Sequence, residues 1–120
     1  MHIKLDKEYE VKCTLGTIRE IETRFKKSFY ELANELTKMP TDEQIKLLYI
    51  GAYKADNKLE LSDFVSKCEE HLGIGTLAEY LEEFLYSLQY PGLTESEVQD
   101  KIEKKLQSNQ KLQQSRSLIG

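Results

Sequence analysis

The sequence predicts a mainly α-helical protein in which a short N-terminal β-hairpin packs on a compact bundle of five to six helices. Three observations lead to this fold class, which a strict count of elements would make α+β. Apolar and polar residues alternate over the first 13 positions, as in half-buried strands. From position 14 onward, apolar residues recur at helical intervals. Residue pairs typical of helix N-termini interrupt that second pattern several times.

The length and composition indicate one domain with its own core. The chain has 120 residues, of which 39% are apolar and 32% charged, and this balance is that of a globular protein. The last residues are rich in Gln and Ser and poor in apolar side chains. We therefore expect a single globular domain over residues 1–106 and a polar, flexible tail over residues 107–120.

The hairpin is predicted over residues 2–13. Its apolar positions alternate on both sides of a turn near Asp6 and Lys7, and they are Ile3, Leu5, Tyr9, Val11 and Cys13. A lone hairpin is marginally stable in water, so its apolar face needs a helical layer. We expect that layer to be the helix that follows directly.

Six helices are predicted, over about 14–25, 28–39, 42–54, 62–72, 76–90 and 94–106. Four of them begin at a hydroxyl residue followed three positions later by Glu or Gln, a capping box: Ser28 and Glu31, Thr41 and Gln44, Thr76 and Glu79, Thr94 and Glu97. The Met39-Pro40 pair ends the second helix, and Gly73 ends the fourth, which starts at Ser62.

The third helix is apolar on more than one side, which predicts the central and most buried position in the bundle. The predicted core comprises Leu15, Ile18, Ile21, Phe25, Phe29, Leu32, Leu36, Ile45, Leu48, Tyr49, Leu81, Phe84 and Leu88. These residues recur on one face of each predicted helix, and the hairpin is expected to rest on the first of them.

Charge and cysteine content argue against several partners. The net charge is −4, and residues 61–93 carry six acids against the single base Lys67, a local balance of −5 that would repel nucleic acid. Cys13 and Cys68 belong to no metal-binding motif, which favours a reduced, intracellular setting. No stretch is apolar enough for a membrane span or a signal peptide, so we expect a cytoplasmic protein.

No catalytic, cofactor-binding or metal-binding residue is predicted, and we do not expect an enzyme. The segment that starts at Asp56 resembles a calcium loop but has Leu61 at the glycine position and Lys67 at the last ligand position. His71 follows Glu70 directly, and adjacent side chains on a helix diverge by about 100°. His2 lies near the N-terminus without a partner motif.

The fifth helix has aromatic residues beyond those needed to hold it on the core. Tyr86 and Tyr90 lie away from its apolar stripe. The last helix carries only a sparse apolar row of Val98, Ile102 and Leu106. One hypothesis is that these five residues form a partner-binding surface bordered by acidic side chains. The alternative is that the row closes the core and Tyr86 is solvated.

The strand pair, the segment "KCTLGTIREIETRFKKSFYELANEL" and the apolar helix "IKLLYIGAYK" together resemble the tail assembly chaperones of long-tailed (siphovirus-type) bacteriophages or prophages of Gram-positive bacteria. The resemblance is most specific over Thr14 to Leu36, around "TLGTIREIE", and extends more loosely to about Leu88. Beyond Pro91 the sequence shows no such likeness.

The resemblance implies a non-enzymatic protein of the host cytoplasm. It would bind the tape measure protein, keep its apolar helices soluble, assist assembly of the tail tube protein and be absent from the mature virion. It implies no catalytic or cofactor residue, and self-association stays open. The alternative function is a small cytoplasmic adaptor or regulatory domain that binds one partner protein.

Overall fold

The chain begins with the predicted antiparallel hairpin in the computed structural model, which describes residues 1–104. Strand β1 (His2–Lys4) pairs with β2 (Glu8–Glu10), and Ile3 lies opposite Tyr9. The Leu5 N–H donates to the Lys7 carbonyl at 2.9 Å, which closes the turn at the predicted place. Ile3 and Leu5 are buried, so the alternating pattern identified the inward face correctly.

Helices make up most of the remaining described chain, which confirms the mainly α fold class. They are α1 (Leu15–Phe25), α2 (Phe29–Glu35), the 3-10 turn η1 (Leu36–Lys38), α3 (Thr41–Ala55), α4 (Leu61–His71) and α5 (Ile74–Gln89). Residues 95–104 form a further helix. The expected tail at 107–120 and Leu106 lie outside the described residues.

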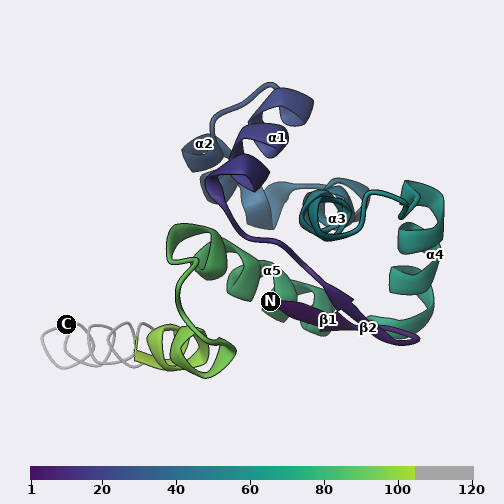
Figure 1. Ribbon diagram of the computed structural model, residues 1–120. Helices are drawn as coiled ribbons and strands as arrows, with labels where there is room; N and C mark the ends of the chain where they lie inside the picture. Colours follow the sequence, from purple (N-terminus) through teal and green to yellow (C-terminus); the bar gives the residue numbers. More distant parts are fainter. Residues whose placement is uncertain (105–120) are drawn as a thin grey trace, which may run out of the picture.

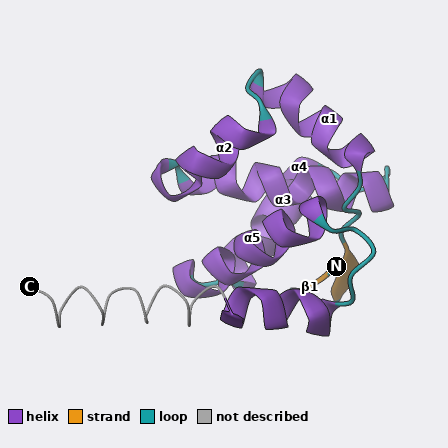
Figure 2. Cartoon of the chain, turned by 90° about the vertical axis from the view of Figure 1, so that its left-hand side faces the viewer, coloured by secondary structure: helices purple, strands orange, loops and turns teal. Residues whose placement is uncertain are grey.

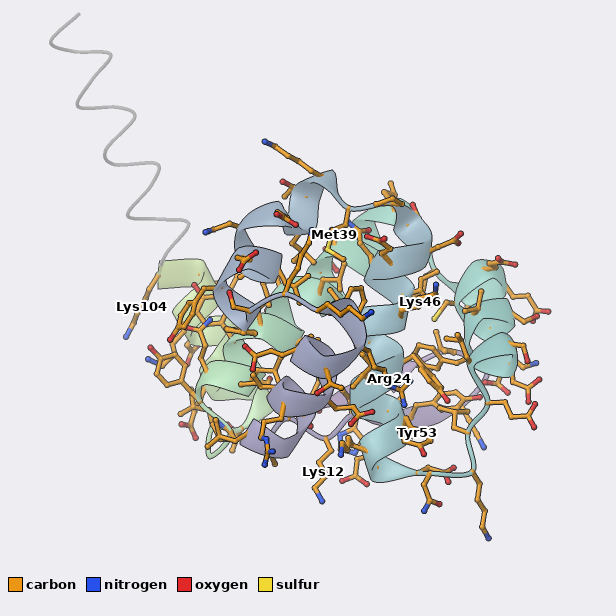
Figure 3. The ribbon with its side chains drawn as sticks, turned by 90° about the horizontal axis from the view of Figure 1, so that it is seen from above. Lys12, Arg24, Met39, Lys46, Tyr53 and Lys104 are labelled. Carbon is orange, nitrogen blue, oxygen red and sulfur yellow. The ribbon has the colours of Figure 1, made fainter. Side chains whose placement is uncertain are left out.

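Helix α3 is the centre of the fold, as its apolar content predicts. It packs against α1, α4, α5 and β2, and Figure 1 shows it end-on between α4 on one side and the α1–α2 pair on the other. Its buried residues lie on several sides of the helix and include Leu47, Leu48, Ile50 and Ala52. The Arg24 guanidinium of α1 lies 5.2 Å from the ring centroid of Tyr53 on α3 (Figure 3).

The hairpin was expected to pack on the first helix, but it packs on α3. The Lys12 N–H donates to the Gly51 carbonyl of α3 at 2.9 Å. A Cβ atom on Gly51 would lie only 2.5 Å from Cγ1 of Val11, so the glycine is what allows the two segments to approach this closely. On the far side, the Lys4 N–H donates to the Tyr80 hydroxyl of α5 at 3.1 Å.

Helix α1 instead buries a face centred on Ile21 and Thr17. The Thr17 hydroxyl donates to the Lys12 carbonyl at 2.6 Å. The Thr17 N–H donates to the Thr14 hydroxyl, and the Thr14 N–H donates to the Thr17 hydroxyl. These two hydrogen bonds cap the helix. Leu15 was expected in the core but is 77% exposed, because it lies about 120° around the helix from Ile21.

The other core predictions fall into two groups. Ile18, Phe25 and Leu36 are half-buried at the edge of the core. The rest are buried as predicted: Ile21, Phe29, Leu32, Ile45, Leu48, Tyr49, Leu81, Phe84 and Leu88.

Two of the four predicted capping boxes are present in recognisable form. The Ser28 hydroxyl accepts from the Glu31 N–H, and the Thr94 hydroxyl accepts from the Glu97 N–H, both at 3.2 Å. Met39 is extended before Pro40, which ends the helical run as predicted. The second helix is shorter than expected because its last turn tightens into η1.

The remaining helix starts differ from the predictions. Helix α3 begins at Thr41 itself after Pro40, whose fixed φ favours helix entry. The Gln44 side chain, expected to complete a cap there, donates to the Leu36 carbonyl at 2.8 Å. Helix α4 begins at Leu61, one residue before Ser62, and α5 begins at Ile74, two residues before Thr76.

Candidate partner-binding groove

The residues predicted to meet a partner do not form one exposed stripe. Tyr86 is half-buried on α5. Tyr90, just past the end of α5, is 45% exposed, and the Lys101 ammonium lies 4.5 Å from its ring centroid. Val98 and Ile102 are only 1% and 7% exposed.

The burial of Val98 and Ile102 agrees with the alternative in which this row packs inward, although Tyr86 is half-buried and not fully solvated. Residues 95–104 lie beside α5, on the side away from α2 (Figure 2). The Nδ1 atom of His2 lies 3.0 Å from a carboxylate oxygen of Glu95, which ties this helix to β1 as well. A sparse row is sufficient because residues four apart share one helix face. In this arrangement these two side chains offer no apolar surface to a partner.

The structure shows a different apolar feature, a groove between α5 and the α2–η1 segment. Its volume is about 690 Å³. One wall is the outer face of α5, and the other comes from the end of α2, from η1 and from the start of α3. The lining residues are Ala33, Asn34, Leu36, Thr37, Gln44, Ile74, Ala78, Leu81, Glu82, Leu85, Tyr86 and Gln89.

The lining of the groove ranges from buried at Leu81 to strongly exposed at Ile74. Leu81 is buried, Leu36 and Leu85 are half-buried, and Ile74 is 73% exposed. The α5 wall extends over the full 16 residues of that helix, about 24 Å at 1.5 Å per residue. Its shape and lining are those of a surface that can accept another extended or helical segment.

Helix α5 as a whole is negatively charged. Helix α5 contains Glu79, Glu82 and Glu83 and no Lys or Arg, and among the described residues that line the groove Glu82 is the only charged one. Any segment that binds along α5 therefore gains from carrying basic residues next to its apolar ones.

Glu83 lies on a different side of α5 from the groove. It is 8% exposed, and burial raises the pKa of its carboxyl group. The nearby Glu95 carboxylate acts in the same direction, while the N-terminal ammonium and His2 oppose it. This carboxylate belongs to the contact region of the hairpin and the last helix, outside the groove.

The cysteines show no reactive environment. Cys13 and Cys68 are free and buried. Burial raises the pKa of each thiol to about 11, so thiolate is scarce at neutral pH.

The acidic and histidine residues singled out in the sequence form no metal site within residues 1–104. The Lys58 N–H donates to the Asp56 carboxylate at 3.1 Å, an ordinary turn between α3 and α4. Glu70 and His71, expected to diverge, do approach to 3.8 Å. They can do so because both are exposed long side chains at the end of α4, where solvent leaves them room.

The groove was missed because it depends on how α2 lies relative to α5. Tyr86 was identified, but the α2 wall was not, since no local pattern predicts where two helices diverge. Ile74 was an available signal, because it is an apolar residue directly before the predicted fifth helix and outside its apolar stripe.

Comparisons with protein-family models, with curated proteins and with solved structures find no match to this chain. Among the described helices, none has the combination of length and apolar character required to cross a membrane.

Proposed function

We propose that this protein is a non-enzymatic binding protein whose α2–α5 groove holds apolar helical segments of a partner protein. The observation that carries the proposal is the open, largely apolar groove along the whole outer face of α5. Half-buried Leu85 and Tyr86 offer apolar contact area there, and Ile74 extends it into solvent.

The partner we propose is a phage tape measure protein, so that the chain acts as a tail assembly chaperone in the host cytoplasm and assists addition of the tail tube protein. The sequence resemblance over Thr14 to Leu36 supports this choice of partner. The groove supports a partner with apolar helices, because an apolar helix that lies in a groove buries its exposed surface without either chain having to unfold. The acidic residues of α5 would help keep such a complex soluble.

The proposal is tested by co-expressing the full chain with the neighbouring tail genes and measuring capture of the tape measure protein. Tyr86→Ser removes aromatic area from the groove wall and should reduce capture. Tyr30→Ser is the matched control, because Tyr30 is exposed on α2 and does not line the groove. Equal capture by both variants would contradict the groove as the binding site.

The gene setting distinguishes this function from that of a host adaptor. A long, helix-rich reading frame directly downstream supports the tail chaperone. A setting without phage structural genes would leave the groove as the docking site of an adaptor or regulatory domain and would overturn the proposed partner.

A further inference from the structure

We propose that the groove between α2 and α5 binds an amphipathic helix of the partner protein, with apolar residues in a heptad repeat and a basic residue beside that repeat. This inference rests on the proposed function, because it takes the groove as the binding site, and it specifies the kind of helix that fits. It follows from the spacing of apolar residues on α5, from the polarity of the opposite wall and from the charge of Glu82.

Helix α5 carries two apolar rows, and the first is sufficient to hold it on the core. The buried residues of this first row are Leu77, Leu81, Phe84 and Leu88. The second row lines the groove and consists of Ile74, Ala78, Leu81 and Leu85. Successive residues of the second row alternate between four and three positions apart, as the a and d positions of a coiled coil do. A helix that packs on this row therefore needs apolar residues at the same interval.

The second row is accessible over most of its length. Ile74 is 73% exposed, Ala78 is exposed and Leu85 is half-buried. The α5 wall of the groove begins at Ile74 and ends at Gln89, and this length corresponds to about two heptads. A partner helix of about 16 residues would match it, because both helices rise by about 1.5 Å per residue.

The opposite wall requires a helix that is polar on its other side. Asn34 and Thr37 line this wall, together with Gln44 at the start of α3. A helix that is apolar all round would bury these polar groups without hydrogen bonds, which is costly. An amphipathic helix can turn its apolar side to α5 and offer polar side chains to Asn34 and Thr37. The groove therefore favours an amphipathic helix.

The charge of Glu82 specifies the residue beside the repeat. Glu82 is half-buried in the groove lining, and it takes part in none of the ion pairs within residues 1–104. It directly follows Leu81, which places it at an e position, where coiled coils pair opposite charges between helices. A Lys or Arg of the partner helix would complement this carboxylate.

The same charge argues against a second copy of this chain as the occupant. A two-fold pairing would lay α5 against α5 of the other copy. Each of these helices contains three glutamates and no Lys or Arg. Like charges that face each other in this way oppose association, so a basic partner helix fits the groove better.

Three synthetic peptides of about 16 residues test the kind of helix, with binding to the full chain measured by fluorescence anisotropy at physiological ionic strength. Two peptides carry leucine at every a and d position, and they have lysine or glutamate at the e and g positions. The third has the composition of the lysine peptide but alternates leucine with polar residues. The lysine heptad peptide should bind at least about tenfold more tightly than either of the others.

A charge reversal in the protein tests the role of Glu82. Glu82→Lys should weaken binding of the lysine heptad peptide by about threefold to tenfold and strengthen binding of the glutamate peptide. Glu70→Lys is the matched control, because Glu70 is an exposed residue of α4 outside the groove lining. This control should leave the ratio of the two dissociation constants unchanged. The dispersion of amide signals checks the folding of each variant.

A second pair of variants tests the apolar row. Ile74→Ser should weaken binding of the lysine heptad peptide, because Ile74 lines the groove. Leu15→Ser is the matched control and should leave binding unchanged. Leu15 is the first residue of α1 as Ile74 is of α5, and the two side chains are 77% and 73% exposed. Leu15 does not line the groove.

Three results would overturn the proposal. They are equal binding of the two lysine peptides, an unchanged peptide preference in Glu82→Lys, and a dimeric full chain that becomes monomeric on Ile74→Ser, which would make a second copy the occupant. Failure of tape measure capture by a chain that still prefers the lysine heptad peptide would count against the proposed partner alone. Capture that Tyr86→Ser reduces but Glu82→Lys leaves intact would count against this inference alone.

Discussion

Replacing Gly51 by Ala tests how tightly the hairpin is held on the central helix. In an unobstructed helix this change is stabilising by about 0.5–1 kcal/mol, because glycine loses more backbone freedom on folding. Here the added Cβ would lie 2.5 Å from Cγ1 of Val11 and 2.9 Å from Cε1 of Phe84. Both neighbours are 1% exposed, and a β-branched valine has little rotamer freedom with which to move.

Overpacking of this kind costs about 1–3 kcal/mol, which exceeds the gain in helix propensity. We expect Gly51→Ala to lower the free energy of unfolding by about 1–2 kcal/mol. The hydrogen bond from the Lys12 N–H to the Gly51 carbonyl adds to the cost if the strand shifts to relieve the clash. Urea denaturation followed by circular dichroism measures the effect as a lower midpoint at unchanged slope.

Gly75→Ala is the matched control, since Gly75 also lies in a helix and a Cβ there would meet nothing within 4 Å. This variant should be as stable as the parent or more stable by up to about 1 kcal/mol. If Gly51→Ala proved as stable as Gly75→Ala, the reasoning that the hairpin is fixed by this close approach would be refuted.

Two further predictions concern the core and the buried carboxylate. Ile21→Ala should lower the free energy of unfolding by about 2–5 kcal/mol, and a change below about 0.5 kcal/mol in denaturant titration would contradict the burial of this face. Glu83→Gln should stabilise the protein at neutral pH, with a gain that shrinks as the pH falls. The raised pKa of Glu83 means that the native state binds the proton more tightly than the unfolded state does. The cost of burying the charge therefore exists above that pKa and disappears as the carboxyl group is protonated. Denaturation across an acidic pH series measures the gain, and a gain independent of pH would refute this cause.

The hairpin and the buried residues of the helices could be predicted because their patterns are local. Alternation identified Ile3, Leu5 and Val11 as the inward face, and helical spacing identified Ile21 and Phe84. The prediction that Leu15 is buried was wrong, because the row of four apolar residues in the first helix extends beyond the face that α3 covers. Thr17 was overlooked because a polar side chain becomes fully buried only when a particular carbonyl, here that of Lys12, is available to it.

The helix on which the hairpin rests was not predictable from local sequence. It depends on Gly51, whose missing side chain matters only once Val11 is known to lie above it. The groove has the same origin, since its two walls belong to segments about 40 positions apart. Helix periodicity alone was sufficient to select Tyr86. The burial of Val98 and Ile102, in contrast, could be predicted only with the knowledge that α5 lies against them.

The dependence of the hairpin on later parts of the chain imposes an order on folding during synthesis. Residues 1–13 leave the ribosome well before Gly51 and Tyr80, which hold them in place. Until α3 and α5 have emerged, the two strands are an isolated hairpin, which is marginally stable in water. These residues therefore reach their final positions only after later parts of the chain have been made.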